Sequence, residues 1–473
     1  MEKEMKNYDP YKRTILFFAS FINIILMTII FAYSWYGYYA STMFQITFYR
    51  KGHYAMLALY ALLMFFFSTM YGGLKIGQLR RIEVMLSQYL SLLFTNAVAY
   101  IVICLLAFGI VNPMQLILVM LLEMFVATIW NIIIIYFYNR IFQPWKILLI
   151  YGERPAADLV YKVEARRDKY AIYDAINIDE GIDVIAEKMK DFQAVIIGDI
   201  SAIKRNDILK YCYAHKIRAY VIPKVSDIIL MGADRIHVFD TPFLLSKGYT
   251  LSFDQRLAKR ILDLVIAVPL ALLLSPVMLI TALAIKLYDK GPVFYKQVRC
   301  TKNNREFAII KFRSMIVNAE SDGVAKLASE NDSRITPIGK FIRATRIDEL
   351  PQLINIIRGD MSFVGPRPER PEIIREYCEN MPEFSFRTRV KAGLTGFAQV
   401  YGKYNTTPYD KLKLDLFYIE NYSFWMDLKL ILMTVKTILK KEATEGVADG
   451  QVTAQKEEKQ ESVEDIVREI IKK

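Results

Sequence analysis

The sequence predicts a membrane protein of the α plus α/β class, in which a four-helix transmembrane bundle precedes a Rossmann-like domain and a membrane-associated α/β domain. Hydrophobic residues make up 54% of the 473 residues although 23% are charged, so apolar residues must gather in blocks. Four such blocks near the N-terminus are each long enough to cross about 30 Å of hydrocarbon as a helix. Beyond residue 144, short apolar runs alternate with helical stretches, as in parallel α/β domains.

The four apolar blocks cover residues 14–36, 54–74, 89–111 and 114–137 and define a first domain, residues 1–143. Basic residues lie before the first block, between the second and third, and after the fourth (Lys3, Lys6, Lys12, Arg13, Lys75, Arg80, Arg81, Arg140 and Lys146). The other side carries Arg50 and Lys51. This bias predicts that both ends of the bundle lie in the cytoplasm. Glu123 lies inside the fourth block, where a carboxylate serves either a function or a contact between helices.

Residues 144–250 are predicted to form a Rossmann-like cytoplasmic domain, with buried parallel strands at residues 146–152, 194–198 and 218–223. A dinucleotide-binding domain carries G-x-G-x-x-G after its first strand. Here the stretch from Gly152 reads GERPAA, so one glycine remains and a glutamate stands where a pyrophosphate would bind. We therefore interpret this domain as a spacer, regulatory or assembly module.

A fifth apolar block, residues 261–287, opens the last large domain, residues 251–440. A full crossing would carry the many basic residues after it outside, against the positive-inside bias. Ser275 and Pro276 stand in the middle of the block. Pro276 cannot donate to the Leu272 carbonyl, and the Ser275 hydroxyl can satisfy a freed backbone group. A re-entrant helix that returns to the same face and a kinked spanning helix both fit these residues.

Asp348 and Glu349 form an adjacent carboxylate pair with arginines on both sides. Apolar residues at 338, 341, 342 and 345 predict an amphipathic helix before the pair, and Asp348 is expected to cap a second helix that Gly359 ends. Taken alone, such a pair is more often a helix cap than a catalytic pair. Cations around an ionised aspartate are also what a carboxylate nucleophile aimed at phosphorus needs, because they screen the repulsion between two anions.

Six motifs follow one another in this last domain: KFRSM (311–315), RITPIGKFIR (334–343), DELPQL (348–353), GDMSFVGPRPE (359–369), AGLTGFAQV (392–400) and LDLFYIENYS (414–423). In this order they resemble the polyprenyl-phosphate glycosyl-1-phosphate transferases, the large monotopic phosphoglycosyl transferases of bacterial exopolysaccharide and capsule biosynthesis. The resemblance covers residues 252–440, with Ala392 where the family usually has proline. Larger family members carry a four-helix bundle and a Rossmann-like domain ahead of the catalytic part, and their Ser-Pro break defines a re-entrant helix.

The resemblance implies transfer of a sugar 1-phosphate from a UDP-sugar to a polyprenyl phosphate such as undecaprenyl phosphate, with release of UMP. It implies a covalent phosphosugar on Asp348, and Glu349 as a ligand of Mg²⁺, an ion that one carboxylate and substrate phosphates can hold. Asp415 would be a secondary site residue for metal or sugar. The implied phosphate-binding residues are Lys311, Arg313, Arg343, Arg346 and Arg367. The catalytic domain would face the cytoplasm at the bacterial inner or plasma membrane.

The net charge of +12 suits anionic partners, and no nucleic-acid recognition motif accompanies it. The sequence leaves a homo-oligomer open. Residues 441–473 are predicted to be a polar tail without fixed packing, although Val463, Ile466, Val467 and Ile470 fall on one helical face. Two other functions compete: the many-helix enzymes that catalyse the same overall reaction without a covalent intermediate, which need many more spanning helices, and a membrane-tethered nucleotide sensor.

Overall fold

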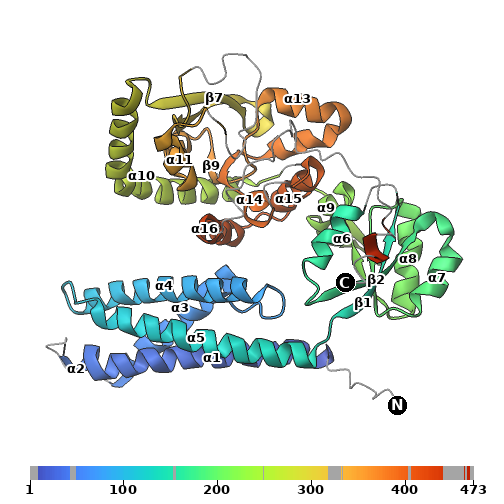
Figure 1. Ribbon diagram of the computed structural model, residues 1–473, viewed down its shortest axis with the longest axis horizontal. Coiled ribbons are helices and arrows are strands. Elements are labelled where there is room, and N and C mark those ends of the chain that lie inside the picture. The colour runs from blue at the N-terminus through green and yellow to red at the C-terminus, as the bar shows by residue number, and fades with distance from the viewer. Residues whose placement is uncertain are drawn as a thin grey trace. The chain divides into compact units, whose positions relative to one another are not determined.

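The computed structural model describes residues 9–42, 50–152, 156–248, 250–317, 332, 334–402, 406–439, 463 and 466–468. The chain forms two compact units: Met1–Ile222 together with Lys459–Lys473, and Pro223–Glu458. The first unit holds a bundle of long helices and a parallel sheet, and the second holds a long apolar helix and a small α/β fold (Figure 1). The predicted fold class is confirmed.

The bundle consists of α1 (Lys12–Ser34), α3 (Arg50–Tyr71), α4 (Arg81–Leu106) and α5 (Met114–Ile141). α1 runs into a short α2 (Ala40–Thr42) through a π-helical turn, Trp35–Tyr39. Each of the four long helices has the length and apolar composition to cross a membrane, as predicted. In the most apolar stretch of each, 39% of the residues or fewer are buried, so most side chains remain available to lipid.

Glu123 is fully buried where α3, α4 and α5 meet. Its carboxylate accepts hydrogen bonds from the Tyr60 hydroxyl (2.6 Å) and from Asn96 Nδ2 (2.7 Å). Further along, Asn131 Nδ2 donates to Gln88 Oε1 (2.5 Å). Hydrogen bonds between helices stabilise an apolar bundle where water is absent. Of the two roles left open for Glu123, the structure shows the contact between helices.

The parallel sheet has the strand order β2-β1-β3-β4. Its strands are β1 (Trp145–Tyr151), β2 (Tyr170–Asn177), β3 (Ala194–Ile197) and β4 (Arg218–Val221). The sequence predicts β1, β3 and β4 but not β2, whose edge position tolerates a mixed polar and apolar pattern. α7 (Ile182–Met189) and α8 (Ala202–Ala214) cover the face that carries Leu148 and Val195. α6 (Ala157–Glu164) packs on the opposite face, against Leu149 and Ile196.

The C-terminal segment shares that second face with α6. Val463, Ile466 and Val467 are helical and only 7%, 5% and 2% exposed, and they pack in one cluster with Leu149 and Ile196. Both faces of a parallel sheet need apolar cover, and these three side chains supply part of it. The expectation of no fixed packing therefore fails for these residues, while Ile470 lies outside the described residues.

The second unit begins with α9 (Val225–Met231), an antiparallel pair β5 (Asp234–Val238) and β6 (Thr241–Leu245), and α10 (Phe253–Asp289). β7 (Phe294–Cys300) and β8 (Glu306–Phe312) then form an antiparallel hairpin through η4 (Lys302–Asn304). The elements that follow are α11 (Pro337–Ala344), η5 (Ile347–Glu349), α12 (Gln352–Arg358), β9 (Ser362–Val364), α13 (Pro371–Asn380), η6 (Pro382–Arg389), β10 (Gly393–Thr395), α14 (Phe397–Tyr401), α15 (Pro408–Glu420) and α16 (Phe424–Ile438).

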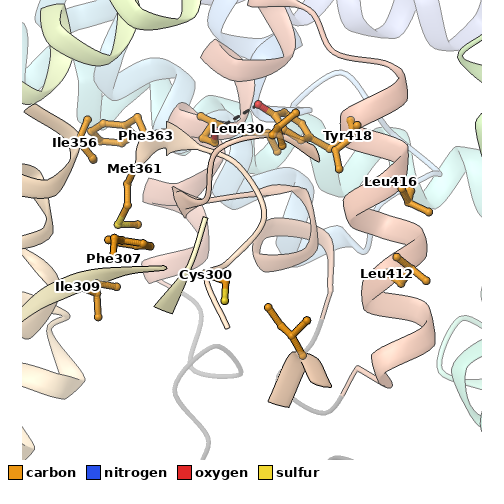
Figure 2. Packing of buried hydrophobic residues seen from close by; sticks show 14 of the residues in the cluster. Cys300, Phe307, Ile309, Ile356, Met361, Phe363, Leu412, Leu416, Tyr418 and Leu430 are labelled. Carbon is orange, nitrogen blue, oxygen red and sulfur yellow. Dashed lines mark hydrogen bonds between the residues drawn. The ribbon is translucent and has the colours of Figure 1, made fainter. Parts of the chain in front are cut away.

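One hydrophobic core holds this unit together. Phe307 from β8, Ile356 from α12, Leu416 from α15 and Leu430 from α16 meet in it, as Figure 2 shows. Ile228 of α9 belongs to the same core and is 2% exposed. The short strands β9 and β10 pair in parallel beside it and fix the two loops that follow them.

α10 is a continuous helix of 37 residues with Pro269 and Pro276 inside it. The Ser275 hydroxyl donates to the Leu272 carbonyl (2.7 Å), the group that Pro276 leaves without its helical N–H donor. Figure 1 shows that the helix turns a sharp corner between two arms. The local hydroxyl bond that the sequence suggests is therefore present.

Candidate active site

The Asp348-Glu349 pair lies on a tight turn between two short helices. The Thr336 side chain caps α11 by accepting from Gly339 N (2.9 Å), and Pro337 starts the helix. Arg346 then takes a left-handed conformation, with φ of 57°, which stops helical propagation. The pair follows at once in the 3₁₀ turn η5, Ile347–Glu349. A non-glycine residue in this region is strained, and such strain gathers at functional sites.

The predictions for the helices on either side of the dyad are confirmed in part. The amphipathic helix before the pair is confirmed as α11, and Gly359 ends α12 with φ of 89°, also as expected. The expectation that Asp348 caps α12 is wrong, because Pro351 occupies the N-cap position and no side chain caps this helix. The two carboxylates therefore need another explanation than helix capping.

Glu349 is held by two cations. Its Oε1 accepts from Lys311 Nζ of β8 and from Arg367 Nη2, each at 3.1 Å. Burial alone would raise the pKa of this carboxyl group, but the charges of Lys311, Arg367 and Arg346 outweigh burial and hold the pKa far below its usual range. Glu349 is thus a fixed anion at any ordinary pH.

Asp348 is in a different state from its neighbour. No hydrogen bond or ion pair to its carboxylate is found among the described residues. Burial raises its pKa, the charge of Glu349 raises it further, and Lys311, Arg343 and Arg367 oppose both effects. Environments that move the pKa values of two adjacent carboxyl groups apart are typical of sites where the two groups do different work.

Four of the five proposed phosphate-binding residues lie close enough to act on the pair electrostatically: Lys311, Arg343, Arg346 and Arg367. Arg313 is not one of the charged residues that shift the pKa of Asp348 or Glu349 most. This residue follows the end of β8, and its guanidinium pairs with Asp289 at the end of α10. Lys311 and Arg313 therefore belong to two separate ion pairs.

Asp415 belongs to a buried ionic network behind Arg367. Its Oδ2 accepts from Arg387 Nε (2.6 Å), and Arg387 Nη2 donates to the Arg367 carbonyl (3.2 Å). Glu369 pairs with Lys411 and lies 3.7 Å from Arg387. Burial opposes ionisation of Glu369, but Lys411 and Arg387 overcome it and lower its pKa to about 2. The network supports the backbone that carries Arg367.

Sequence reasoning missed Glu369, Arg387 and Lys411 as parts of this network. One available signal is the spacing of Lys411 and Asp415, which places both on one face of α15. Another is the position of Glu369 two residues after Arg367.

The backbone around Arg367 leaves no room for side chains at two glycines. A Cβ on Gly365 would lie 2.3 Å from the Lys391 carbonyl oxygen, and one on Gly396 would lie 2.2 Å from the Gly365 carbonyl oxygen. The loops after β9 and β10 therefore touch through bare backbone. Ala392 donates its N–H to Thr301 Oγ1 (3.1 Å), a bond that the proline usual in the family cannot make.

A divalent cation at the dyad would need ligands from the substrate as well as from the protein. No group of three or more His, Cys, Asp or Glu side chains is placed to hold a metal ion in the part of the chain that the structure describes. In this same part, Glu349 Oε2 accepts no hydrogen bond. Mg²⁺ takes one or two carboxylates and completes its shell with substrate phosphates and water. The dyad fits such an ion together with a bound diphosphate.

Comparisons with known proteins identify the family of this chain. Residues 254–441 match the family described as bacterial sugar transferase. The chain is 34% identical over 330 residues, 67% of this chain and 73% of the relative, to the UDP-N-acetylgalactosamine-undecaprenyl-phosphate N-acetylgalactosaminephosphotransferase of Aeromonas hydrophila.

Two further relatives are named UDP-glucose:undecaprenyl-phosphate glucose-1-phosphate transferase. The protein of Caulobacter vibrioides is 42% identical over 188 residues, 39% of this chain and 70% of the relative. The protein of Escherichia coli is 40% identical over 209 residues, 43% of each chain. The chain therefore belongs to the bacterial sugar transferase family and is a homologue of the undecaprenyl-phosphate hexose-1-phosphate transferases.

Proposed function

We propose that this protein transfers a sugar 1-phosphate from a UDP-sugar to undecaprenyl phosphate and releases UMP, as the first membrane step of exopolysaccharide or capsule biosynthesis. The names of its relatives support the donor and acceptor. Family membership removes the many-helix enzymes from consideration. The arginine-flanked dyad has no place in a nucleotide sensor, which removes the other alternative.

The observation that carries the mechanism is the unequal state of two neighbouring carboxylates. Glu349 is locked between Lys311 and Arg367, whereas Asp348 has no partner among the described residues and lies beside the same cations. A carboxylate that is unpaired and close to positive charge can approach an anionic phosphorus. Asp348 is therefore the nucleophile, and Glu349 is the fixed anion beside it.

The reaction has two displacements. An Asp348 carboxylate oxygen attacks the β-phosphorus of the UDP-sugar, the bond from that phosphorus to the bridging oxygen breaks, and UMP leaves with the electron pair. A phosphate oxygen of undecaprenyl phosphate then attacks the same phosphorus and expels the Asp348 carboxylate. The lipid diphosphate sugar is the product, and the enzyme returns to its starting state.

The cations around the dyad neutralise the charge that both displacements gather. Lys311, Arg343, Arg346 and Arg367 bind phosphate oxygens of donor and acceptor. Mg²⁺, when held by Glu349 and the diphosphate, adds further charge neutralisation. Arg313 and Asp415 act at a distance, Arg313 by fixing the end of α10 and Asp415 by holding Arg387 against the Arg367 carbonyl.

The membrane arrangement is part of the same proposal. Residues 1–143 form the transmembrane domain, residues 144–250 a degenerate Rossmann-like domain, residues 251–440 the re-entrant helix with the catalytic domain, and residues 441–473 the tail. Within this division, α9 at the end of the second domain packs on the core of the catalytic domain. α10 enters one leaflet and returns at the Ser275-Pro276 corner. The dyad faces the cytoplasm of the bacterial inner or plasma membrane, where UDP-sugars are available, and the lipid acceptor reaches it from the leaflet.

The test is to trap the phosphosugar on the protein. Purified full-length protein is incubated with each of a panel of UDP-sugars without lipid acceptor, and intact mass and UMP release are measured with and without EDTA. We expect one equivalent of sugar phosphate on the peptide that contains Asp348, UMP release with the matching sugar, and loss of the adduct in Asp348→Asn. Asp191→Asn, an exposed aspartate of the α/β domain, is the matched control. Exchange of labelled UMP at the normal rate in Asp348→Asn would refute the assignment.

A further inference from the structure

A groove of about 730 Å³ opens at the start of α10, on the second unit. It is lined by the residues that lead into the helix, by η4 and by the end of η6. Three cations, Arg256, Lys302 and Arg389, come from these three elements, and no carboxylate is among the lining residues. Thr250 Oγ1 donates to the Arg389 carbonyl (3.3 Å), which ties two walls of the groove together.

The three cations differ from most others near the core of this unit. Lys259 pairs with Asp427, and Arg387 pairs with Asp415. By contrast, Arg256 and Lys302 make no ion pair with any carboxylate among the described residues. Arg389 lies over the Phe386 ring and acts on Glu420 without an ion pair to it. Like charges that converge on one groove repel each other and favour an anion between them. The groove therefore suits a ligand that carries negative charge.

An exposed apolar strip starts at the same groove. Phe253 lines the groove and is 73% exposed, and Leu257, Ile261 and Val265 follow at 50%, 54% and 63%. Residues four apart lie along one side of a helix, so the strip runs from the groove along the first arm of α10. α10 is also one of the helices with the length and composition to enter a membrane.

We propose that this groove binds the phosphate-bearing head group of an anionic membrane phospholipid, whose acyl chains lie along the Phe253–Val265 strip. The cationic groove matches the anionic head group of such a lipid, and the apolar strip matches its acyl chains. The bound lipid fixes the first arm of α10 at the head-group layer of the membrane.

This lipid site is separate from the dyad. Lys302 precedes β8, whereas Lys311, which contacts Glu349, stands near the far end of that strand. A strand rises about 3.3 Å per residue, so the two lysines are on the order of 20 Å apart. A lipid in the groove is therefore distinct from the proposed lipid substrate at the dyad.

The test is photocrosslinking of lipid to the full-length protein in nanodiscs. Phosphatidylglycerol with a photoreactive group on its head group is expected to label residues 248–256, a tryptic peptide between Lys247 and Arg256. Unlabelled phosphatidylglycerol should remove most of this labelling, and phosphatidylcholine should not. The double substitution Lys302→Gln with Arg389→Gln leaves the tryptic peptide unchanged and should lower its labelling at least fivefold. Arg375→Gln, an exposed arginine on α13, is the matched control and should leave it unchanged.

Several results would overturn the proposal. Equal labelling from a phosphatidylcholine probe would mean that the groove does not select charge. Competition by inorganic phosphate would assign it to a soluble anion. Labelling that survives the double substitution would place the lipid elsewhere. Thermal unfolding of each variant shows whether it folds. If the double variant does not fold, the competition between lipids in the unaltered protein still tests whether the groove selects an anionic lipid. The readout is lipid contact, so its failure leaves the proposed reaction untouched.

Discussion

At the scale of single residues, the dyad shows how position decides what a carboxylate can do. Asp348 and Glu349 are neighbours in one turn, yet two cations contact Glu349 and none contacts Asp348 among the described residues. The turn is responsible, because the left-handed Arg346 redirects the chain before α12 begins. The surroundings of Asp348 therefore disfavour its ionised form, whereas those of Glu349 favour its ionised form.

The substitution Asp348→Asn should stabilise the protein while it abolishes turnover. The pKa of Asp348 is raised in the folded state by burial and by Glu349, so ionisation of this group opposes folding at every pH above its ordinary pKa. An asparagine removes that cost. We expect Tm at pH 7 to rise by about 2 °C or more, and sugar transfer to fall at least about 10³-fold. The gain in Tm should shrink as the pH falls below the raised pKa and should vanish only below the ordinary aspartate pKa of about 3.9, where the carboxyl group is protonated in both states.

The matching substitution Glu349→Gln should have the opposite effect on stability. The pKa of Glu349 is lowered, so its charge stabilises the fold above the ordinary glutamate pKa, and this contribution disappears only as the pH falls through the lowered value. Its loss leaves Lys311 and Arg367 without their shared anion. We expect a cost of about 2 kcal/mol, below the roughly 3–5 kcal/mol of a fully buried pair because the Arg367 side chain is 38% exposed. Equal Tm values for Glu349→Gln and the unaltered protein at pH 7 would contradict this reading.

The sequence could predict the residues that share one motif and not the contacts between motifs. Asp348 and Glu349 lie beside Arg343 and Arg346 in the chain, so proximity follows from the sequence alone. Arg313 illustrates the limit, because its partner Asp289 stands 24 residues earlier and meets it only after α10 and β8 have folded. The Arg387–Asp415 pair likewise depends on how η6 meets α15.

At the scale of elements, α10 and the strands show what periodicity can and cannot establish. A long apolar run is compatible with few structures other than a membrane-length helix, so the four bundle helices and α10 are predictable from composition. β2 is not, because an edge strand with tyrosine and aspartate among its residues lacks a clear alternation of apolar and polar side chains. The bond from the Ser275 hydroxyl to the Leu272 carbonyl is predictable, because Pro276 leaves that carbonyl without its N–H donor.

The path of α10 in the membrane can be tested with a cysteine at its end. Lys290 follows the helix and is exposed. In intact cells, Lys290→Cys should resist an impermeant maleimide and should react after the cells are opened, because a re-entrant helix leaves its end in the cytoplasm. The background substitutes Cys104, Cys212, Cys300 and Cys378 by serine or alanine. Labelling of Lys290→Cys from outside would show that α10 crosses the membrane.

The C-terminal segment should be needed for the stability of the parallel sheet. Ile466 is 5% exposed against the apolar face that includes Leu149 and Ile196. Ile466→Asp places a carboxylate in this contact and should cost about 3 kcal/mol in the free energy of unfolding of the α/β domain. Hydrogen exchange at the amides of β1 and β3 measures the effect, with Ile203→Asp, at an isoleucine of α8 that is 78% exposed, as the matched control. Unchanged protection in Ile466→Asp would show that the sheet does not depend on this segment.

At the scale of the whole molecule, the proposed chemistry is confined to one of the two units. Among the described residues, Asp348, Glu349 and the cations that act most strongly on them belong to Pro223–Glu458 (Lys311, Arg343, Arg346 and Arg367). The Caulobacter vibrioides relative agrees with such independence, since the 188 matched residues make up 70% of its length but only 39% of this chain. We therefore predict that the chemistry at the dyad does not require the first unit.

Residues 223–458 expressed alone should therefore form the phosphosugar adduct on Asp348, whereas residues 251–458 should fail to fold stably. The difference lies in α9, because Ile228 is buried in the core of this unit and Gly232 approaches the Glu420 backbone so closely that a Cβ would lie 2.6 Å from its carbonyl oxygen. Removing α9 exposes that part of the core to water. Intact mass after incubation with the matching UDP-sugar reports the adduct, and thermal unfolding in the same detergent reports folding for both chains. A folded chain of residues 223–458 that forms no adduct would mean that the first unit contributes to the site, and a stable, active chain of residues 251–458 would place the boundary of the catalytic part after α9.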